Sequence, residues 1–326
     1  MRKHLLLAFG LTALAVMVPG SSAQKKYKIT LIPGLTTDGF YITMNKGAQA
    51  AAAKLGVEVD FQGAPDFNPV TQIPVLNAVI ARKPDGILIA PTDTKQLIAP
   101  MKKAADAGIK ILTVDTFIGT DGKYQTGSGD ADFPLSYVSS DNVNGGVVGA
   151  DALAKAIGEK GSVYVSNVKP GISTTDQREA GFKEGMKKYP NIKVLETQFN
   201  DNDANKAASQ FAAVLARNPD IAGVFGANLF SAQGASNGVK AAKKGGGLVN
   251  VVAFDCPESI INDVKGGNID LAICQRPAEM GQVGVEYMVK ALNGEKVPAR
   301  YGTGYFVIDK KNADSAEAKA ATYASK

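Results

Sequence analysis

The stretch ITLIPGLTTDGFYITMNKGAQAAAAKLGVEVDF, residues 29–61, contains one full unit of the pattern that decides the fold. It opens with a short apolar run at 29–33, continues with an amphipathic segment at 41–55 that stops at Gly56, and closes with a second apolar run at 57–61. A continuous apolar run is typical of a strand covered on both faces, and a glycine after an amphipathic segment is a common helix end. This stretch therefore predicts a strand, a helix and a second, parallel strand.

The same alternation continues along the chain. Further strands are predicted at 86–90, 109–115, 137–140, 162–166, 194–199, 221–226, 249–255 and 271–275. Further helices are predicted at 69–81, 95–107, 142–157, 177–188, 204–217, 231–244 and 280–292. The order β-α-β-α-β-α-β, repeated twice, predicts an α/β protein with two doubly wound parallel sheets. The polar stretch 119–132 is long for a loop in such a unit, so it marks a boundary or a functional loop.

The first 23 residues are organised as an export signal. Met1-Arg2-Lys3-His4 is a short basic start, residues 5–18 are almost wholly apolar, and Ser21-Ser22-Ala23 places small side chains where a signal peptidase cleaves. A membrane anchor is the alternative, but about 14 apolar residues are too few to span roughly 30 Å of hydrocarbon. We expect a mature protein that begins at Gln24, works in the periplasm and, with no cysteine near the cleavage point, carries no lipid tether.

Composition limits the classes of function. The formal net charge is +5, or +3 once Arg2 and Lys3 leave with the signal, and so small a surplus indicates neither nucleic acid nor an acidic membrane as a partner. The single histidine is His4, so the mature chain can hold neither a Ser-His nor a Cys-His nucleophile pair and lacks the commonest zinc ligand. This makes an enzyme less expected without excluding one that uses carboxylates or lysine.

No sequence motif for a cofactor or metal is present. Gly145-Gly146-Val147-Val148-Gly149 has the wrong spacing for a dinucleotide fingerprint and lies inside a helical pattern, where glycines indicate close helix packing. Cys256 and Cys274 both lie at the ends of predicted strands. An oxidising compartment permits a disulfide between them, and two small buried thiols are an equally good interpretation.

Polar and aromatic side chains follow the predicted strands, at the edge where open parallel sheets bind ligands. An Asp or Asn after a strand is most often a helix cap, which we prefer for Asp93 and Asn142, while Asp38 or a neighbouring threonine could cap the first helix. Arg178 is expected to open a helix, where a cation opposes the helix dipole and therefore favours an anionic partner or ligand. The other members of the set are Phe40, Tyr41, Asp115, Thr116, Asn228, Asp255 and Gln275.

Taken together, these side chains suit a neutral, polyhydroxylated ligand. Carboxylates accept hydrogen bonds from neighbouring sugar hydroxyls, while arginine and amide groups donate to them. Aromatic rings such as Phe40 and Tyr41 can cover the apolar face of a pyranose. Charged groups are tolerable in a closed cleft because they pair with each other and with the ligand.

With these residues in order behind an export signal, the chain resembles the type I periplasmic sugar-binding proteins of ABC importers, the ribose-binding-protein-like family. The resemblance covers nearly all of residues 27–308. It is carried by Asp38-Gly39-Phe40-Tyr41, Pro91-Thr92-Asp93, Val114-Asp115, Ser140-Asp141-Asn142-Val143-Asn144-Gly145-Gly146, Arg178-Glu179-Ala180-Gly181-Phe182, Val224-Phe225-Gly226-Ala227-Asn228, Val252-Ala253-Phe254-Asp255 and Ala272-Ile273-Cys274-Gln275.

The resemblance implies two lobes that are joined by a three-strand hinge and close on a sugar. The N-terminal lobe would comprise residues 24–139 and 277–303, and the C-terminal lobe 140–276 and 304–326. Phe40 and Tyr41 would flank the sugar ring. The other implied ligand positions are Asp38, Asp115, Arg178, Asn228, Asp255 and Gln275.

The sequence also departs from the ribose receptors. Thr116, followed by Phe117, stands where they have an arginine, Asn202 lies where they have an aromatic residue, and Leu229 replaces a carboxylate. The site is therefore predicted to be less basic and less aromatic than a ribose site. Thr116 and Asn202 join the predicted ligand-binding set, and the ligand is expected to be a pentose, a hexose or a deoxyhexose whose methyl would meet Thr116 and Phe117.

The function that the resemblance implies is transport without chemical transformation. The protein, expected to be a monomer without a cofactor, would capture a monosaccharide, close, and deliver it to the transmembrane subunits of a separate permease. The alternatives are a sugar-responsive transcription regulator, which the leader and the missing DNA-binding head disfavour, and an exported glycosidase that uses Asp115 and Asp255. A partner of a chemotaxis receptor and a receptor for amino acids or signalling molecules also stay open.

Overall fold

The computed structural model describes residues 26–119 and 131–324. The predicted export signal, and with it cleavage after Ala23, lies outside the described residues, as does most of the predicted loop at 119–132. Within the described ranges, no helix combines the length and the apolar character that crossing a membrane requires.

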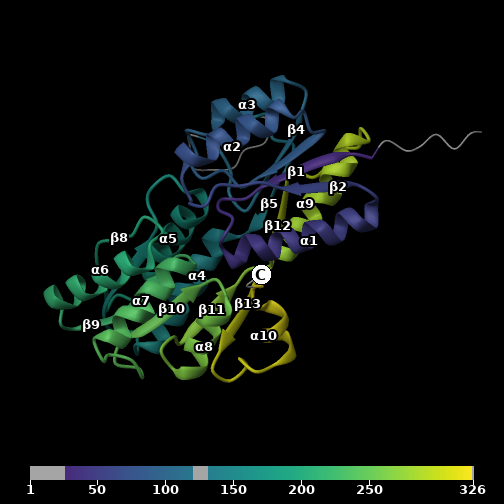
Figure 1. Ribbon diagram of the computed structural model, residues 1–326. Helices are drawn as coiled ribbons and strands as arrows, with labels where there is room; N and C mark the ends of the chain where they lie inside the picture. Colours follow the sequence, from purple (N-terminus) through teal and green to yellow (C-terminus); the bar gives the residue numbers. More distant parts are fainter. Residues whose placement is uncertain (1–25, 120–130, 325–326) are drawn as a thin grey trace, which may run out of the picture.

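The chain forms two α/β lobes, each built on a sheet (Figure 1). The strands of the first sheet are β1 (Lys28–Ile32), β2 (Glu58–Phe61), β3 (Gly86–Ile89), β4 (Lys110–Val114), β5 (Tyr137–Ser140) and β12 (Arg300–Thr303). Their order is β12-β5-β4-β3-β1-β2, and every pairing is parallel.

The second sheet repeats this arrangement. Its strands are β6 (Gly161–Asn167), β7 (Ile192–Val194), β8 (Gln198–Phe199), β9 (Ile221–Gly226), β10 (Asn250–Phe254), β11 (Leu271–Cys274) and β13 (Phe306–Asp309). The order is β13-β11-β10-β9-β6-β7, with β8 paired to the C-terminal end of β6. Only β13 runs antiparallel among the described strands, and the chain enters it directly from β12 of the first sheet without an intervening helix.

Helices cover both faces of each sheet. The first lobe has α1 (Gly39–Leu55), α2 (Pro69–Ala81), α3 (Ile98–Asp106) and α9 (Pro277–Leu292). The second has α4 (Asn142–Ala156), α5 (Ser173–Met186), α6 (Ala204–Arg217), α7 (Leu229–Ala241), α8 (Glu258–Gly266) and α10 (Ala316–Ala321). Successive residues of β3 show why the strands are apolar throughout: Leu88 packs in the core that contains α1 and α9, while Ile87 and Ile89 pack in the core under α2 and α3.

The sequence predicted most of these elements. Every predicted strand is present, although the one expected at 194–199 is divided into β7 and β8. The helix expected at 95–107 begins only at Ile98, and α5 begins at Ser173 rather than at 177, because Ser, Thr and Asp in its first turn are weak helix formers and hid its start. Four elements were missed: α8, β12, β13 and α10.

The predicted role of the glycines near residue 145 is confirmed. A Cβ on Gly146 of α4 would lie 2.1 Å from the carbonyl oxygen of Arg178 in α5, and one on Gly181 of α5 would lie 2.0 Å from the carbonyl oxygen of Val143 in α4. The two helices therefore touch backbone to backbone. The pair α1 and α9 is built in the same way, through Gly47 and Gly281.

The chain crosses between the lobes three times near the hinge. It passes from β5 to α4, from β11 to α9, and from β12 to β13. Figure 1 shows the elements that they connect around the middle of the molecule, where the two lobes meet. The assignment of residues 24–139 and 277–303 to one lobe, and of 140–276 and 304–326 to the other, stays a prediction.

Candidate functional site

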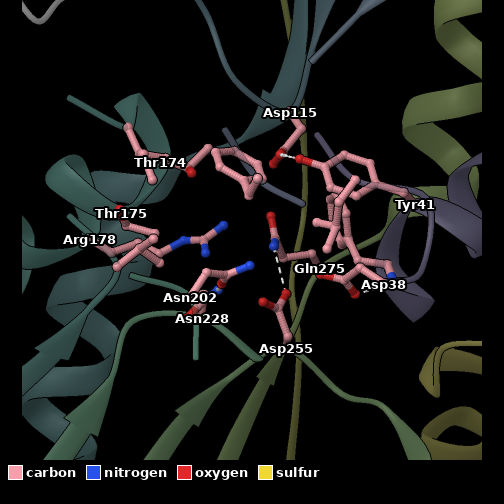
Figure 2. A pocket seen from close by; sticks show the side chains of 15 residues that line it. Asp38, Tyr41, Asp115, Thr174, Thr175, Arg178, Asn202, Asn228, Asp255 and Gln275 are labelled. Atoms are coloured by element: carbon pink, nitrogen blue, oxygen red, sulfur yellow. Dashed lines mark hydrogen bonds between the residues drawn. The ribbon is translucent and has the colours of Figure 1, made fainter. Parts of the chain in front are cut away.

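A cavity lies between the lobes, where the carboxyl ends of both sheets face each other (Figure 2). The space between its lining atoms, including space open to solvent, is ≈ 400 Å³. The first lobe contributes Leu35, Asp38, Phe40, Tyr41, Phe67 and Asp115 to the lining. The second lobe and the hinge contribute Val168, Ile172, Thr174, Thr175, Arg178, Asn202, Asn228, Asp255 and Gln275.

Nine of the ten predicted site residues line this cavity, and Thr116 does not. The Thr116 side chain is fully buried, and its hydroxyl donates to the carbonyl oxygen of Pro91 at 2.7 Å. Phe117 is also buried and packs edge-on against Tyr137, with ring centroids 5.2 Å apart. The contact expected between a sugar methyl and these two residues is therefore not available in this arrangement.

The prediction missed several lining residues. Phe67 lies in the loop between β2 and α2, directly before the helix cap Asn68, and an aromatic residue at such a loop end was a usable signal. Thr174 and Thr175 belong to the first turn of α5. They were missed because the sequence predicted that this helix begins only at residue 177.

Asp115 and Asp255 occupy equivalent places in the two lobes, directly after β4 and β10. Both have left-handed backbone conformations, with φ of 61° and 79°, which are uncommon for residues other than glycine and cluster at functional sites. The carbonyl oxygen of Asp115 is held by the hydroxyls of Tyr137 (2.7 Å) and Ser139 (2.8 Å). This conformation turns both carboxylates toward the centre of the cavity (Figure 2).

The three carboxylates are anchored to different degrees. Asp255 accepts hydrogen bonds from the Leu229 backbone N–H (3.1 Å), the Gln275 amide (2.7 Å) and the Tyr323 hydroxyl (3.0 Å). Asp115 accepts from the Tyr41 hydroxyl at 2.7 Å. Asp38 caps α1 by accepting from the Phe40 backbone N–H at 2.8 Å, which confirms it among the capping candidates.

Arg178 lies in the second turn of α5, so the expectation that it opens the helix was wrong. Its Nε donates to Asn142 Oδ1 and its Nη1 to the carbonyl oxygen of Ala227, both at 2.9 Å, and its guanidinium carbon lies 3.8 Å from the centre of the Phe254 ring. These contacts fix the guanidinium, which points into the cavity (Figure 2).

The capping predictions at Asn142 and Asp93 had different outcomes. Asn142 is not the cap of α4: Asp141 is, accepting from the Asn144 backbone N–H at 3.1 Å, and Asn142 is free to orient Arg178. Asp93 does accept the backbone N–H groups of the next turn, those of Lys95 and Gln96, although that turn precedes α3.

The electrostatics of the cavity favour a neutral ligand. Burial, and secondarily the charge of Asp255, raises the pKa of Asp38 to about 7. Burial also raises the pKa of Asp115 to about 6, against the lowering effects of Arg178 and of the Tyr41 hydroxyl. Arg178 therefore has its countercharge inside the cavity, and an anionic ligand would meet three carboxylates there.

Two buried polar atoms of the lining have no hydrogen-bond partner among the described residues: Gln275 Oε1 and Thr175 Oγ1. A buried polar atom without a partner costs about 1–3 kcal/mol, so its presence in a cavity indicates a ligand that supplies the partner. Sugar hydroxyls can do so, because each both donates and accepts. Among the described residues, no group of His, Cys, Asp and Glu side chains could hold a metal ion.

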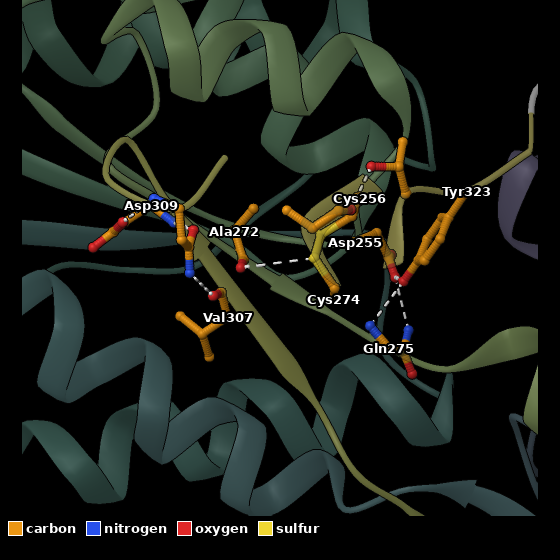
Figure 3. Close-up of a disulfide and its surroundings, with 11 residues drawn as sticks. Asp255, Cys256, Ala272, Cys274, Gln275, Val307, Asp309 and Tyr323 are labelled. Atoms are coloured by element: carbon orange, nitrogen blue, oxygen red, sulfur yellow. Dashed lines mark hydrogen bonds between the residues drawn. A yellow bond between two sulfur atoms is a disulfide. The ribbon is translucent and has the colours of Figure 1, made fainter. Parts of the chain in front are cut away.

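A disulfide joins Cys256 and Cys274, which settles the alternative left open by the sequence (Figure 3). Cys256 follows Asp255, and Cys274 precedes Gln275. The bond therefore ties the ends of β10 and β11 together beside two cavity residues that are hydrogen-bonded to each other.

The family model for the periplasmic binding protein domain matches residues 29–296. This chain belongs to that family. It is 32% identical over 284 residues to the ribose import binding protein of Salmonella typhimurium, covering 86% of this chain and 90% of the relative. It is 30% identical over 314 residues to the D-allose-binding periplasmic protein of Escherichia coli, covering 95% and 98%. The resemblance read from the sequence is thus confirmed.

Solved structures of the family match the fold closely. A solute-binding protein of an ABC transporter from Agrobacterium vitis, bound with alpha-D-tagatopyranose, has a TM-score of 0.90 and 64% identity, covering 92% of this chain and all of that one. A second protein from the same organism, with bound D-fucose, has a TM-score of 0.84 and 28% identity, covering 91% and 100%. The predicted two-lobed fold class is confirmed.

Proposed function

We propose that the protein is the periplasmic solute-binding component of an ABC importer, and that its ligand is a ketohexose in the pyranose form, with D-tagatose as the first candidate. The observation that carries the choice of ligand is the 64% identity to the Agrobacterium vitis protein bound with alpha-D-tagatopyranose. The mixture of hydrogen-bond donors and acceptors in the cavity lining supports the same class of neutral ligand.

In this proposal most of the polar and aromatic lining groups have a role. Asp115, Asp255 and Gln275 accept hydrogen bonds from sugar hydroxyls, and Arg178 and Asn202 donate to them. Asn202 is suited to donate because its Oδ1 already accepts from Asn228 at 2.7 Å. Asp38 faces the ligand from the start of α1, and the rings of Phe40, Tyr41 and Phe67 cover its apolar face.

Binding and closure are coupled, because one sugar contacts both lobes only when they are shut. The closed form then docks, as a monomer, on the transmembrane subunits of the permease. No reaction follows. The glycosidase alternative would need Asp115 and Asp255 as its acid and base, but both oxygens of Asp255 already accept hydrogen bonds from the protein, which suits a binding group better.

The test is a calorimetric and thermal-shift screen of the mature chain, residues 24–326, against monosaccharides. We expect D-tagatose to bind most tightly, ahead of D-fructose, D-ribose and D-allose, and to be recovered chemically unchanged after incubation. The pair D-galactose and D-fucose checks the deoxyhexose expectation, because the two differ in one hydroxyl. Tighter binding of an aldose would remove the ketohexose assignment, and the absence of any monosaccharide binding would remove sugar transport altogether.

A site variant accompanies the screen. Asp255→Ala should reduce affinity by at least 100-fold, about 2.7 kcal/mol, because it removes a buried charged acceptor from the cavity. Asp151→Ala is the matched control, since this carboxylate lies on α4 away from the cavity and pairs with Lys188. Equal affinities of the two variants would show that the ligand binds elsewhere.

A further inference from the structure

The C-terminal tail after β13 lies beyond the residues that match the family model. It begins in the second lobe, where β13 pairs with β11 and Lys265 of α8 pairs with Asp314 at 2.6 Å. Its last described residues, Tyr323 and Ala324, lie between the lobes, beside α1 of the first lobe (Figures 1 and 3).

Tyr323 is packed behind the sugar cavity rather than in its lining. Its side chain is 3% exposed, and its hydroxyl donates to Asp255 Oδ1 at 3.0 Å while accepting from the Gln275 backbone N–H at 3.0 Å. Its own backbone N–H donates to the carbonyl oxygen of Cys256 at 2.9 Å. The tail is therefore hydrogen-bonded to three residues at the back of the site: Asp255, the disulfide cysteine Cys256 and Gln275 next to the hinge.

The same segment contacts the first lobe. The Tyr323 ring meets the ring of Phe40 edge-on, with centroids 5.8 Å apart. The Ala324 backbone N–H donates to Thr43 Oγ1 at 2.7 Å. Residue 39 lies so close that a Cβ there would be 2.9 Å from the carbonyl oxygen of Ala324, so α1 approaches the tail through a glycine.

We propose that Tyr323 is a positioning residue for Asp255 and that the tail is a fourth connection between the lobes, in addition to the three hinge crossings. This inference rests on the proposed sugar-binding function. Asp255 has a left-handed backbone conformation, so its orientation depends on the groups that surround it. Without the Tyr323 hydroxyl, Asp255 loses one of its three donors and the Gln275 backbone N–H loses its acceptor.

The hydroxyl is suited to this role at every physiological pH. Burial, and secondarily the charge of Asp255, raises the pKa of Tyr323 well above its usual range. The group therefore keeps its proton and remains a donor to the carboxylate. Because the Gln275 backbone N–H donates to the same oxygen, the direction of the hydroxyl is fixed before the ligand arrives.

The experiment compares Tyr323→Phe with the wild-type mature chain in calorimetric titrations with D-tagatose. We expect the Kd to rise by roughly tenfold, about 1.4 kcal/mol, as for the loss of a hydrogen bond to a charged group. Tyr164→Phe is the matched control: Tyr164 is as deeply buried in the same lobe, lies outside the cavity lining, and its hydroxyl has no partner among the described residues. It should leave the Kd unchanged.

A double-variant cycle separates positioning from a general structural role. In an Asp255→Asn background, Tyr323→Phe should change binding by less than about twofold, because the group it acts through has been replaced. Binding is read here as the sugar-induced rise in Tm at high sugar concentration, which weak binding still produces. A full tenfold effect in this background would overturn the positioning role.

Deleting residues 323–326 tests the tail as a whole and should weaken binding at least as much as Tyr323→Phe. Wild-type affinity in either the deletion or the Tyr323→Phe variant would overturn the inference and leave the proposed function intact. Failure of the wild-type chain to bind any sugar would instead count against the proposed function.

Discussion

At the scale of single residues, the cavity holds more negative charge than its one guanidinium neutralises. Asp38 and Asp115 are buried, and burial is the main cause that raises both of their pKa values. The folded protein without ligand therefore binds protons that the unfolded chain releases. A neutral ligand that donates hydrogen bonds to these carboxylates relieves part of that cost, which links ligand binding to pH.

The ligand-free protein should become less stable as the pH rises from about 4 to about 7. Asp38 has a folded-state pKa of about 7, above its unfolded value, so its contribution to stability is present at low pH and is lost as the pH passes through the folded-state value. Asp38→Asn keeps the helix cap and removes the titration. The Tm of the variant relative to wild type should therefore rise by several degrees between pH 5 and pH 7.5.

No histidine of the mature chain titrates between pH 5 and pH 7.5 in this comparison of Asp38→Asn with wild type, since the only histidine is His4 in the predicted signal. Thermal unfolding of the mature chain in the absence of sugar, at matched ionic strength, is the measurement. A Tm difference that stays the same at both pH values would contradict the assignment of this titration to Asp38.

At the scale of elements, pairs of neighbouring segments orient the site. Arg178 points into the cavity because α5 lies directly on α4, through Gly146 and Gly181, and because Asn142 at the start of α4 accepts from its Nε. The disulfide between Cys256 and Cys274 likewise fixes two neighbouring elements, because it joins the ends of β10 and β11 next to Asp255 and Gln275.

Removing the disulfide should destabilise the protein by about 3 kcal/mol, the value expected for closing a loop of this size in the unfolded chain. The variant is Cys256→Ala together with Cys274→Ala, which avoids placing hydroxyls at two fully buried positions. Its denaturation midpoint should lie below that of the oxidised wild type and should not respond to a reductant. A wild-type midpoint that is the same with and without reductant would contradict this role.

At the scale of the whole molecule, the structure is a closed form. Besides the contact of the tail with Thr43, two hydrogen bonds between described residues join the lobes away from the three hinge crossings. The Phe117 backbone N–H donates to Ser173 Oγ, and the Thr94 backbone N–H donates to the carbonyl oxygen of Gly171, both at 3.0 Å. The first joins the loop after β4 to the first residue of α5, and the second joins the loop after β3 to the segment just before α5. These bonds hold the lobes together, and opening of the cleft has to break them.

Ser173→Ala should weaken sugar binding without touching the cavity, because Ser173 is not in the lining. A single neutral hydrogen bond contributes about 0.5–1.5 kcal/mol, so we expect the Kd to rise by roughly 2- to 12-fold, mainly through faster dissociation. Calorimetry and stopped-flow dissociation measure the two effects. Ser209→Ala, on the exposed side of α6, is the control, and equal dissociation rates for the two variants would show that the Ser173 contact does not contribute to closure.

The sequence alone determined the α/β class, the repeat of the strand-helix unit and nine residues that line the candidate cavity. Continuous apolar strands and capped helices are local signals, and the carboxyl ends of parallel strands must meet at one edge, so Asp115 and Asp255 could be placed without coordinates. Elements with weak local signals were missed: β12 and β13 are mostly exposed or half-buried and lie at sheet edges, while α8 and α10 are short.

Only the tertiary structure decided which side chains near a strand end face the cavity. Asp115 and Thr116 are adjacent, yet a left-handed turn sends one carboxylate into the cavity and the next hydroxyl to Pro91. The disulfide and the contact of Tyr323 with Asp255 join positions that are 18 and 68 residues apart. Such choices depend on backbone direction and on long-range packing, because a side chain's neighbours are set by where the whole chain folds and not by its own sequence context.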